Sequence, residues 1–231
     1  APQTLEKIPG EAIYVGFSPK DGRWLVSCDS GGNIHLWDTR NLAAEPLKKK
    51  FELKSFKSDQ VSMTFSPGGR WLAAVAGFAP DTEAIFLWDL NNLAADPLIY
   101  RGTEGGVYTF SFSVDEHWFG VGTAPKFDTN TNTVIDGQVY LWDLSAPQSA
   151  AVLLSGHSGY VNSLQFSPDS ALVASGDDAG YLRVWSLADL KSPLAAIRIT
   201  NNWITKVEFS PDGRWLATSN LDWVVELRDT R

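Results

Sequence analysis

Hydrophobic and polar residues alternate along the chain in short runs that are separated by turn residues. The stretch from Ala151 to Trp185 is typical, because it contains the runs AVLLS, VNSLQF, LVASG and YLRVW with Ser-Pro-Asp and Asp-Ala-Gly segments between them. A repeat of two residues in hydrophobicity is that of a half-buried β-strand. The pattern therefore predicts four short antiparallel strands in this stretch and an all-β chain.

The same pattern recurs five times. The copies begin with FSPKDGRWLVS at Phe17, FSPGGRWLAAV at Phe65, FSVDEHWFGVG at Phe112, FSPDSALVASG at Phe166 and FSPDGRWLATS at Phe209. Each copy continues into an alternating segment that ends in Trp-Asp or a variant of it, namely IHLWD, IFLWD, VYLWD, LRVWS and VELRD. Because the copies cover nearly all of the 231 residues, one repeated unit accounts for the length of the chain.

The uninterrupted repeat, from Phe166 to Phe209, is 43 residues long. A lone four-stranded sheet of this size would leave an apolar face in contact with water, so successive sheets must stack face to face. Four-stranded repeats of about 40 to 45 residues are typical of β-propellers. The repeat length therefore predicts a propeller built from such sheets, or blades.

The Gly156-His157 pair and the Trp-Asp endings resemble the WD-repeat (WD40-type) β-propeller family, and the connection WDLNNLAADPL is similar to those of bacterial signalling proteins. The resemblance implies one propeller domain over residues 1–231, with four-stranded antiparallel blades centred near 5–38, 51–89, 98–143, 151–186 and 195–229. The family favours seven blades. A closed five-bladed ring, part of a larger propeller and a ring completed between chains are therefore all open.

The resemblance also implies a structural network, in which the histidine of the Gly-His pair joins a Ser or Thr, an Asp and the Trp. Repeat four supplies His157, Ser175 and Trp185, but Ala179 stands in the Asp slot, six residues before the Trp. In repeats three and five the Asp slot is filled while a threonine stands in the His slot; these residues are Asp136 with Thr103, and Asp222 with Thr200. Since no repeat has the full set, we expect packing to dominate over this network.

Several aromatic residues break the repeat on the rim that carries the binding surface in the family. They lie beside the first strand of a blade or between its second and third strands, and are Tyr108, Tyr160, Trp203 and Trp223. Trp223 stands where other repeats have Gly32, Gly137 and Gly180. A Trp in place of a turn glycine adds nothing to the local fold, whereas Trp and Tyr dominate interface hot spots. The alternative is that these rings cover blade ends.

Two insertions lie at the same rim. The longer one, within GTAPKFDTNTNTVIDG, carries Phe127, and the shorter one, GFAPDTE, carries Phe78. The Thr, Asn and Asp residues of the longer insertion offer nothing to a core, so we expect a mobile loop. Long loops on a rigid scaffold often carry binding residues. Phe78 and Phe127 are therefore predicted to be apolar tips of the same binding surface.

Composition excludes several classes of function. The net charge of −8 argues against nucleic acid as a partner, since phosphate binding requires an excess of Lys and Arg. The longest apolar stretch, 71–79, is less than half of the about 20 residues that span a bilayer, so no membrane contact is expected. The single cysteine, Cys28, fits a reducing, cytoplasmic location.

The motifs of nucleophilic, zinc-dependent and nucleotide-binding enzymes are absent from the sequence, so we predict no catalytic residues, no metal and no cofactor. The prediction is a non-catalytic interaction platform, scaffold or sensor that binds a protein or peptide on the propeller rim. One alternative is a self-assembling propeller fragment whose partners are other copies of the chain. The other is a propeller that binds a small molecule.

Overall fold

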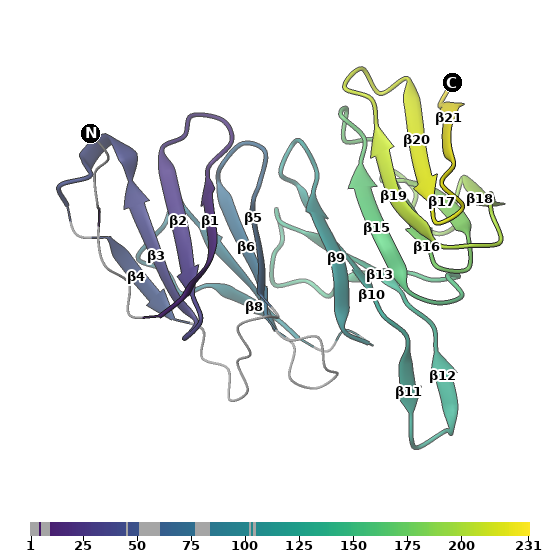
Figure 1. Cartoon of the computed structure of the whole chain (residues 1–231), viewed down its shortest axis with the longest axis horizontal. Helices are drawn as coiled ribbons and strands as arrows, with labels where there is room; N and C mark the ends of the chain where they lie inside the picture. Colours follow the sequence, from purple (N-terminus) through teal and green to yellow (C-terminus); the bar gives the residue numbers. More distant parts are fainter. Residues whose placement is uncertain are drawn as a thin grey trace. The chain divides into compact units, whose positions relative to one another are not determined.

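The computed structural model describes residues 5, 10–44, 46–50, 61–76, 84–101, 103 and 105–231. Apart from one short 3-10 helix, η1 (Thr39–Asn41), the elements of this part of the chain are β-strands (Figure 1). They form five antiparallel sheets of three or four strands and one separate hairpin. This confirms the all-β class and the four-stranded blades of a β-propeller. No helix in the described residues is long and apolar enough to cross a membrane.

The chain divides into two compact units, the first formed by residues 1–77 and 82–101. This unit holds two four-stranded sheets. Sheet one consists of β1 (Ala12–Phe17), β2 (Trp24–Asp29), β3 (Asn33–Asp38) and β4 (Leu47–Lys50), paired in that order. Sheet two consists of β5 (Val61–Phe65), β6 (Trp71–Ala76), β7 (Ala84–Asp89) and β8 (Leu98–Tyr100), again in order.

The second unit, residues 78–81 and 102–231, holds the other three sheets. Sheet three has β9 (Val107–Phe112), β10 (Trp118–Thr123), β13 (Val139–Asp143) and β14 (Val152–Leu154). Sheet four has β15 (Val161–Phe166), β16 (Leu172–Asp177), β17 (Tyr181–Ser186) and β18 (Ala195–Arg198). Sheet five, within the described residues, has β19 (Ile204–Phe209), β20 (Trp215–Asn220) and β21 (Val225–Asp229). The hairpin consists of β11 (Lys126–Asp128) and β12 (Thr133–Ile135).

In each four-stranded sheet the fourth strand is the one that follows the Trp-Asp segment. The predicted range 151–186, for example, begins with β14, yet β14 pairs with β13 of the sheet before it. A repeat counted in the sequence therefore contributes three strands to one sheet and its outer strand to the preceding sheet. The physical reason is local, because the short connection after the third strand returns the chain directly along the edge that this strand leaves open.

A serine fixes the turn between the first two strands of every sheet. Its hydroxyl oxygen accepts a hydrogen bond from the backbone N–H of the residue that begins the second strand, over 2.9 to 3.0 Å. The five pairs are Ser18 with Trp24, Ser66 with Trp71, Ser113 with Trp118, Ser167 with Leu172 and Ser210 with Trp215. The repeated Phe-Ser pattern therefore sets where each second strand starts.

Successive sheets within a unit bury apolar side chains against one another. Between sheets one and two the cluster includes Trp24 from one side and Trp88 from the other. Between sheets three and four, Trp118 and Trp185 take the same two positions. Each interface thus receives one Trp from the start of a second strand and one from the Trp-Asp segment. Burial of such rings is the main source of stability in folds of this kind.

Two turn glycines mark where one sheet meets the loop that leads into the next. Gly180, between β16 and β17, has φ +83°, and a Cβ at this position would lie 2.1 Å from the carbonyl oxygen of Thr200. A Cβ on Gly137, in the equivalent turn of sheet three, would lie 2.3 Å from the carbonyl oxygen of Gly159. Both positions exclude a side chain because the backbone of the following loop already fills the space.

We expect Gly180→Ala to lower the free energy of unfolding by about 3 kcal/mol, since it combines left-handed strain with a steric clash. Gly213 is the matched control, because it has φ +70° but its nearest neighbour would be the Pro168 Cδ at 3.7 Å. Gly213→Ala should therefore cost only about 1 kcal/mol. Chemical denaturation of the two variants measures the difference, and equal losses would contradict the close approach of Thr200.

Candidate partner-binding surface

The structure places the four predicted rim aromatics on the second unit, in two neighbouring pairs. Tyr108 on β9 and Tyr160, directly before β15, are about half exposed, and their rings meet edge to face with centroids 5.4 Å apart. Trp203 lies directly before β19, and Trp223 lies in the turn between β20 and β21. The backbone N–H of Leu221, in that same turn, donates to the carbonyl oxygen of Trp203 over 3.1 Å. The loops that carry the two tryptophans therefore touch.

Trp223 has an unusual conformation for a large side chain. Its φ is +62°, in the left-handed region that Gly32 and Gly180 occupy in the equivalent turns, and its side chain is 97% exposed. A non-glycine residue in this region carries strain of about 1 to 2 kcal/mol. Leu221 and Val224 beside it are also exposed. The turn between β20 and β21 thus presents an apolar cluster that the fold itself does not use.

Asp222 holds this turn in place. Its carboxylate accepts hydrogen bonds from the Thr200 hydroxyl at 2.6 Å and from the Asn202 side-chain amide at 3.0 Å. These hydrogen bonds lower the pKa of Asp222. Thr200 and Asn202 precede Trp203 in the chain, so Asp222 ties the loop of Trp203 to the turn of Trp223. Both rings are consequently carried by loops that the Asp222 carboxylate joins through hydrogen bonds.

The longer insertion differs from its prediction. The expected mobile loop is a regular hairpin of β11 and β12 (Figure 1). In it, Phe127 and Val134 stand directly opposite each other and are exposed. The Asp128 carboxylate closes its turn by accepting from the backbone N–H of Asn130 at 2.8 Å and from the hydroxyl of Thr131 at 2.8 Å. Local capping and one cross-strand apolar pair order this segment without a core.

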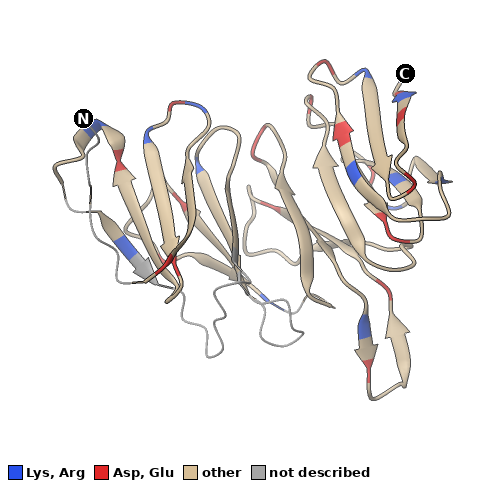
Figure 2. Ribbon diagram, in the orientation of Figure 1, with Lys and Arg blue, Asp and Glu red and all other residues tan. Residues whose placement is uncertain are grey.

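Phe127 therefore lies in the middle of β11 of a defined hairpin, while Phe78 lies outside the described residues. The hairpin replaces the turn between the second and third strands of sheet three, which is the turn that carries Trp223 in sheet five. Figure 2 shows charged residues of both signs on β11 of the hairpin, whereas β12 carries none, and further charged residues on the strands and loops of the second unit.

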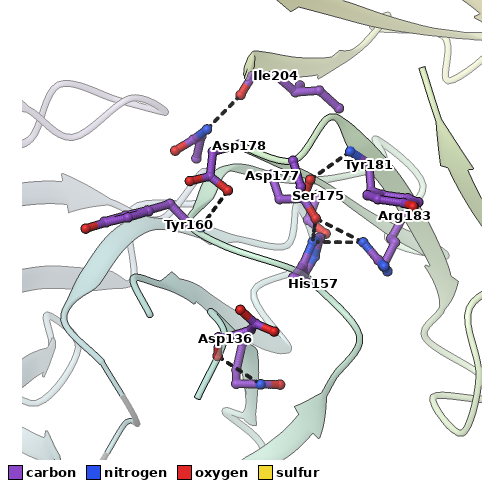
Figure 3. A network of polar contacts seen from close by, with 12 residues as sticks. Asp136, His157, Tyr160, Ser175, Asp177, Asp178, Tyr181, Arg183 and Ile204 are labelled. Atoms are coloured by element: carbon purple, nitrogen blue, oxygen red, sulfur yellow. Dashed lines mark hydrogen bonds and ion pairs between the residues drawn. The ribbon is translucent and has the colours of Figure 1, made fainter. Parts of the chain in front are cut away.

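The polar network of sheet four is more complete than the sequence indicated. His157, in the loop before β15, lies with Nδ1 2.7 Å from the Asp177 carboxylate and Nε2 2.7 Å from the Ser175 hydroxyl (Figure 3). The Arg183 guanidinium reaches the same carboxylate over 3.1 Å, and the backbone N–H of Tyr181 donates to it over 2.7 Å. The His157 and Asp177 side chains are fully buried.

Burial lowers the pKa of His157, with a further contribution from the Arg183 charge, although the Asp177 carboxylate opposes this shift. Burial would raise the pKa of Asp177, but the hydrogen bonds from His157 and Tyr181 and the two nearby basic groups outweigh it and lower the pKa. A neutral imidazole that donates from Nδ1 and accepts at Nε2 satisfies both partners. The Trp185 ring packs beside the imidazole, with centroids 5.9 Å apart.

The expectation that repeat four lacks a carboxylate for this network was wrong. The Asp slot does hold Ala179, but Asp177, two residues earlier, reaches the histidine instead. One sequence feature could have pointed to Asp177, because Asp29 in repeat one also lies eight residues before its Trp. The structure shows that Asp29, like Asp177, is buried. In repeat five the predicted slot does join its partner, through Thr200 and Asp222.

Repeat three arranges its slot residues differently. The Asp136 carbonyl oxygen accepts from the Gln138 side chain over 3.0 Å, and the Thr103 hydroxyl lies 3.4 Å from the carbonyl oxygen of Gly105. These contacts belong to the loops themselves. Within the described residues, no group of three or more His, Cys, Asp or Glu side chains is arranged to hold a metal ion.

We expect Asp177→Asn to lower the free energy of unfolding by about 3 to 5 kcal/mol, because it leaves Arg183 without a buried counter-charge. The matched control is Asp178→Asn, one residue along. Asp178 accepts from the backbone N–H of Tyr160 over 3.0 Å, a bond that an amide oxygen retains. The control should therefore change stability by less than about 1 kcal/mol. Similar losses in both variants, measured by chemical denaturation, would show that the network does not stabilise sheet four.

Comparison with known proteins identifies the repeats. The family described as "WD domain, G-beta repeat" matches residues 15–38, 148–186 and 192–229. Periodic tryptophan protein 2 of Arabidopsis thaliana is 33% identical over 98% of this chain and 28% of its own length. Human apoptotic protease-activating factor 1 is 34% identical over 42% of this chain and 8% of its own length.

The target of rapamycin complex subunit wat1 of Schizosaccharomyces pombe is 22% identical over 94% of this chain and 78% of its own length. The chain thus spans less than a third of the first two relatives and most of the third. The similarity to the relatives from Arabidopsis thaliana and Schizosaccharomyces pombe extends over nearly the whole chain and therefore includes the repeats that form the sheets. Taken with the four-stranded antiparallel sheets, these matches show that the chain belongs to the WD40-repeat family of β-propeller proteins.

Proposed function

We propose that the protein is a non-catalytic interaction module that binds a protein or peptide partner on the rim formed by Tyr108, Tyr160, Trp203 and Trp223, with Phe127 at its margin. The observation that carries this proposal is Trp223, whose side chain is 97% exposed on a left-handed backbone. Such a residue costs stability and gives no packing in return. Exposed, pre-ordered Trp and Tyr side chains are the usual anchors of protein interfaces.

The family supports the coarser part of this proposal. WD40-repeat proteins generally act as scaffolds for other proteins, and the relative from Schizosaccharomyces pombe is named as a subunit of a complex. The acidic charge of the chain, −8, favours encounter with a neutral or basic partner. A cytoplasmic location is part of the same proposal and rests only on the single cysteine.

The turn of Trp223 also favours a partner that differs from a further blade. In the turns at Gly137 and Gly180, the loop leading into the next sheet lies within 2.3 Å of where a Cβ would be. Trp223 fills that space in sheet five with a large side chain. A sheet that docked with the same geometry would collide with it, so the exposed ring is better suited to a differently shaped apolar surface.

The test is selection of a random peptide display library on the wild-type protein, followed by measurement of the selected peptides on variants. We expect the double variant Trp203→Ala, Trp223→Ala to bind them about tenfold or more weakly, since hot-spot rings are lost. Its melting temperature should be nearly unchanged because both rings are exposed. Trp223→Gly alone should be at least as stable as the wild type, since glycine relieves the left-handed strain.

Val152→Ala, Leu153→Ala is the control, because both residues are exposed on β14, away from the rim loops. Peptides that bind the double tryptophan variant as tightly as the wild type would refute the proposed surface. Loss of folding in that variant would instead show that the two tryptophans belong to the core.

Self-association is the second candidate, and exposed apolar residues on sheet one and on sheet five support it. Phe17 on β1 is 61% exposed, whereas its equivalent Phe166 is 4% exposed. Val225 on β21 is 71% exposed, whereas its equivalent Leu182 is 1% exposed. Each of these faces therefore exposes apolar positions that another copy could cover, on sheet five in a geometry that leaves room for Trp223.

Light scattering of the purified chain tests this second candidate. If copies associate through these faces, the mass should exceed that of one chain and return to it in the variant Phe17→Glu, Val225→Glu. Leu153→Glu, which adds a charge at another exposed position, should leave the mass unchanged. A monomeric wild type would rule out self-association.

A further inference from the structure

The interface between sheets four and five has lost both of its tryptophans. Leu172 stands where Trp24 and Trp118 begin the second strands of sheets one and three. Arg228 stands where Trp88 and Trp185 end the third strands of sheets two and four. The two other interfaces described within the units each contain both rings. Among these three interfaces, only the one between sheets four and five lacks the Trp at both positions.

A cavity of about 220 Å³ lies where these rings are missing. Leu172, Leu182 and Val184 of sheet four line it on one side, and Phe209 and Leu216 of sheet five line it on the other. An apolar cavity of about 150 Å³ in another protein stays dry and binds benzene, so this volume is large enough for an aromatic ring. An unfilled cavity lowers the stability of a protein because its lining side chains lack packing contacts, and a ligand that fills the cavity can restore these contacts.

Arg228 lines the cavity, and its guanidinium is engaged on sheet five. Its guanidinium donates to the Thr218 hydroxyl over 3.3 Å and forms an ion pair with Glu226, both on sheet five. The charge of Arg228 is therefore already matched. The wall of the cavity is left predominantly apolar, and a ligand needs no charge to enter it.

The cavity reaches the surface at Leu194 and Ile197, which are exposed and also line it. Asp229 and Thr230 lie on its polar side. A second, polar hollow shares Leu172 and Thr230 with the cavity. A molecule with a flat apolar ring and at most one polar substituent matches this arrangement, because the ring faces the apolar wall and the substituent faces the polar side.

We propose that this cavity is a binding site for a free planar aromatic compound of one or two rings, which takes the place of the indole that other interfaces supply from the chain. The site lies at the start of β20 and the end of β21, whereas Trp223 lies in the turn between these strands. The proposal is therefore independent of the partner-binding rim.

The test is titration of the full chain with indole, followed by NMR amide shifts and by the melting temperature. We expect a dissociation constant of about 1 mM or below, as fits a ligand of this size, with shifts centred on Leu182, Phe209 and Leu216. Arg228→Trp should weaken indole binding by about tenfold or more and raise the melting temperature, since the introduced ring fills the cavity. Arg101→Trp, which adds the same side chain at an exposed position of the first unit, should change neither.

The wild type not binding indole would overturn the proposal, and so would unchanged binding in Arg228→Trp. If Arg228→Trp does not fold, Leu172→Trp fills the cavity from the opposite sheet. It should likewise weaken indole binding and raise the melting temperature. Binding of the peptide Gly-Trp-Gly about tenfold more tightly than indole would assign the site to a protein side chain and overturn the free compound as its ligand.

Discussion

Face-to-face packing of successive sheets is the constraint on which the rest of the structure depends. A four-stranded sheet of some 40 residues cannot bury its own apolar face, so each repeat needs a neighbour. The repeated positions supply that contact with large rings such as Trp118 and Trp185, which meet between sheets three and four. Stability is therefore distributed over interfaces, and each interface can vary without loss of the others.

That independence explains how the interface between sheets four and five can depart from the pattern. Leu172 and Arg228 replace two tryptophans there, yet Leu182, Ile204 and Phe209 remain buried in the same cluster. The remaining apolar contacts keep the sheets together while a cavity persists between them. A globular core without repeats has less scope for such a change, because its side chains share one packed interior.

The aromatic residues of the rim differ from the tryptophans of the interfaces, because they do not pack between two sheets. Asp222 joins the two loops that carry Trp203 and Trp223, and the contact between His157 and Asp177 ties the loop that precedes Tyr160 to sheet four. Buried or well-bonded polar groups thus hold the backbone, and exposed aromatic rings extend from it. For the proposed partner, ordered loops with exposed rings would lower the entropic cost of binding.

The sequence by itself determined the repeat length, the four-stranded sheets and the slots that break the repeat, because period-two hydrophobicity and turn residues act locally. It also singled out Trp223, since a glycine slot is visible in an alignment of repeats. Only the tertiary structure decided that Asp177 completes the His157 network and that the 126–135 insertion is a hairpin. It alone showed the cavity beside Arg228, because a void depends on how the side chains of two different sheets pack against each other. Local rules fix which strands form, whereas contacts between sheets fix what each side chain does.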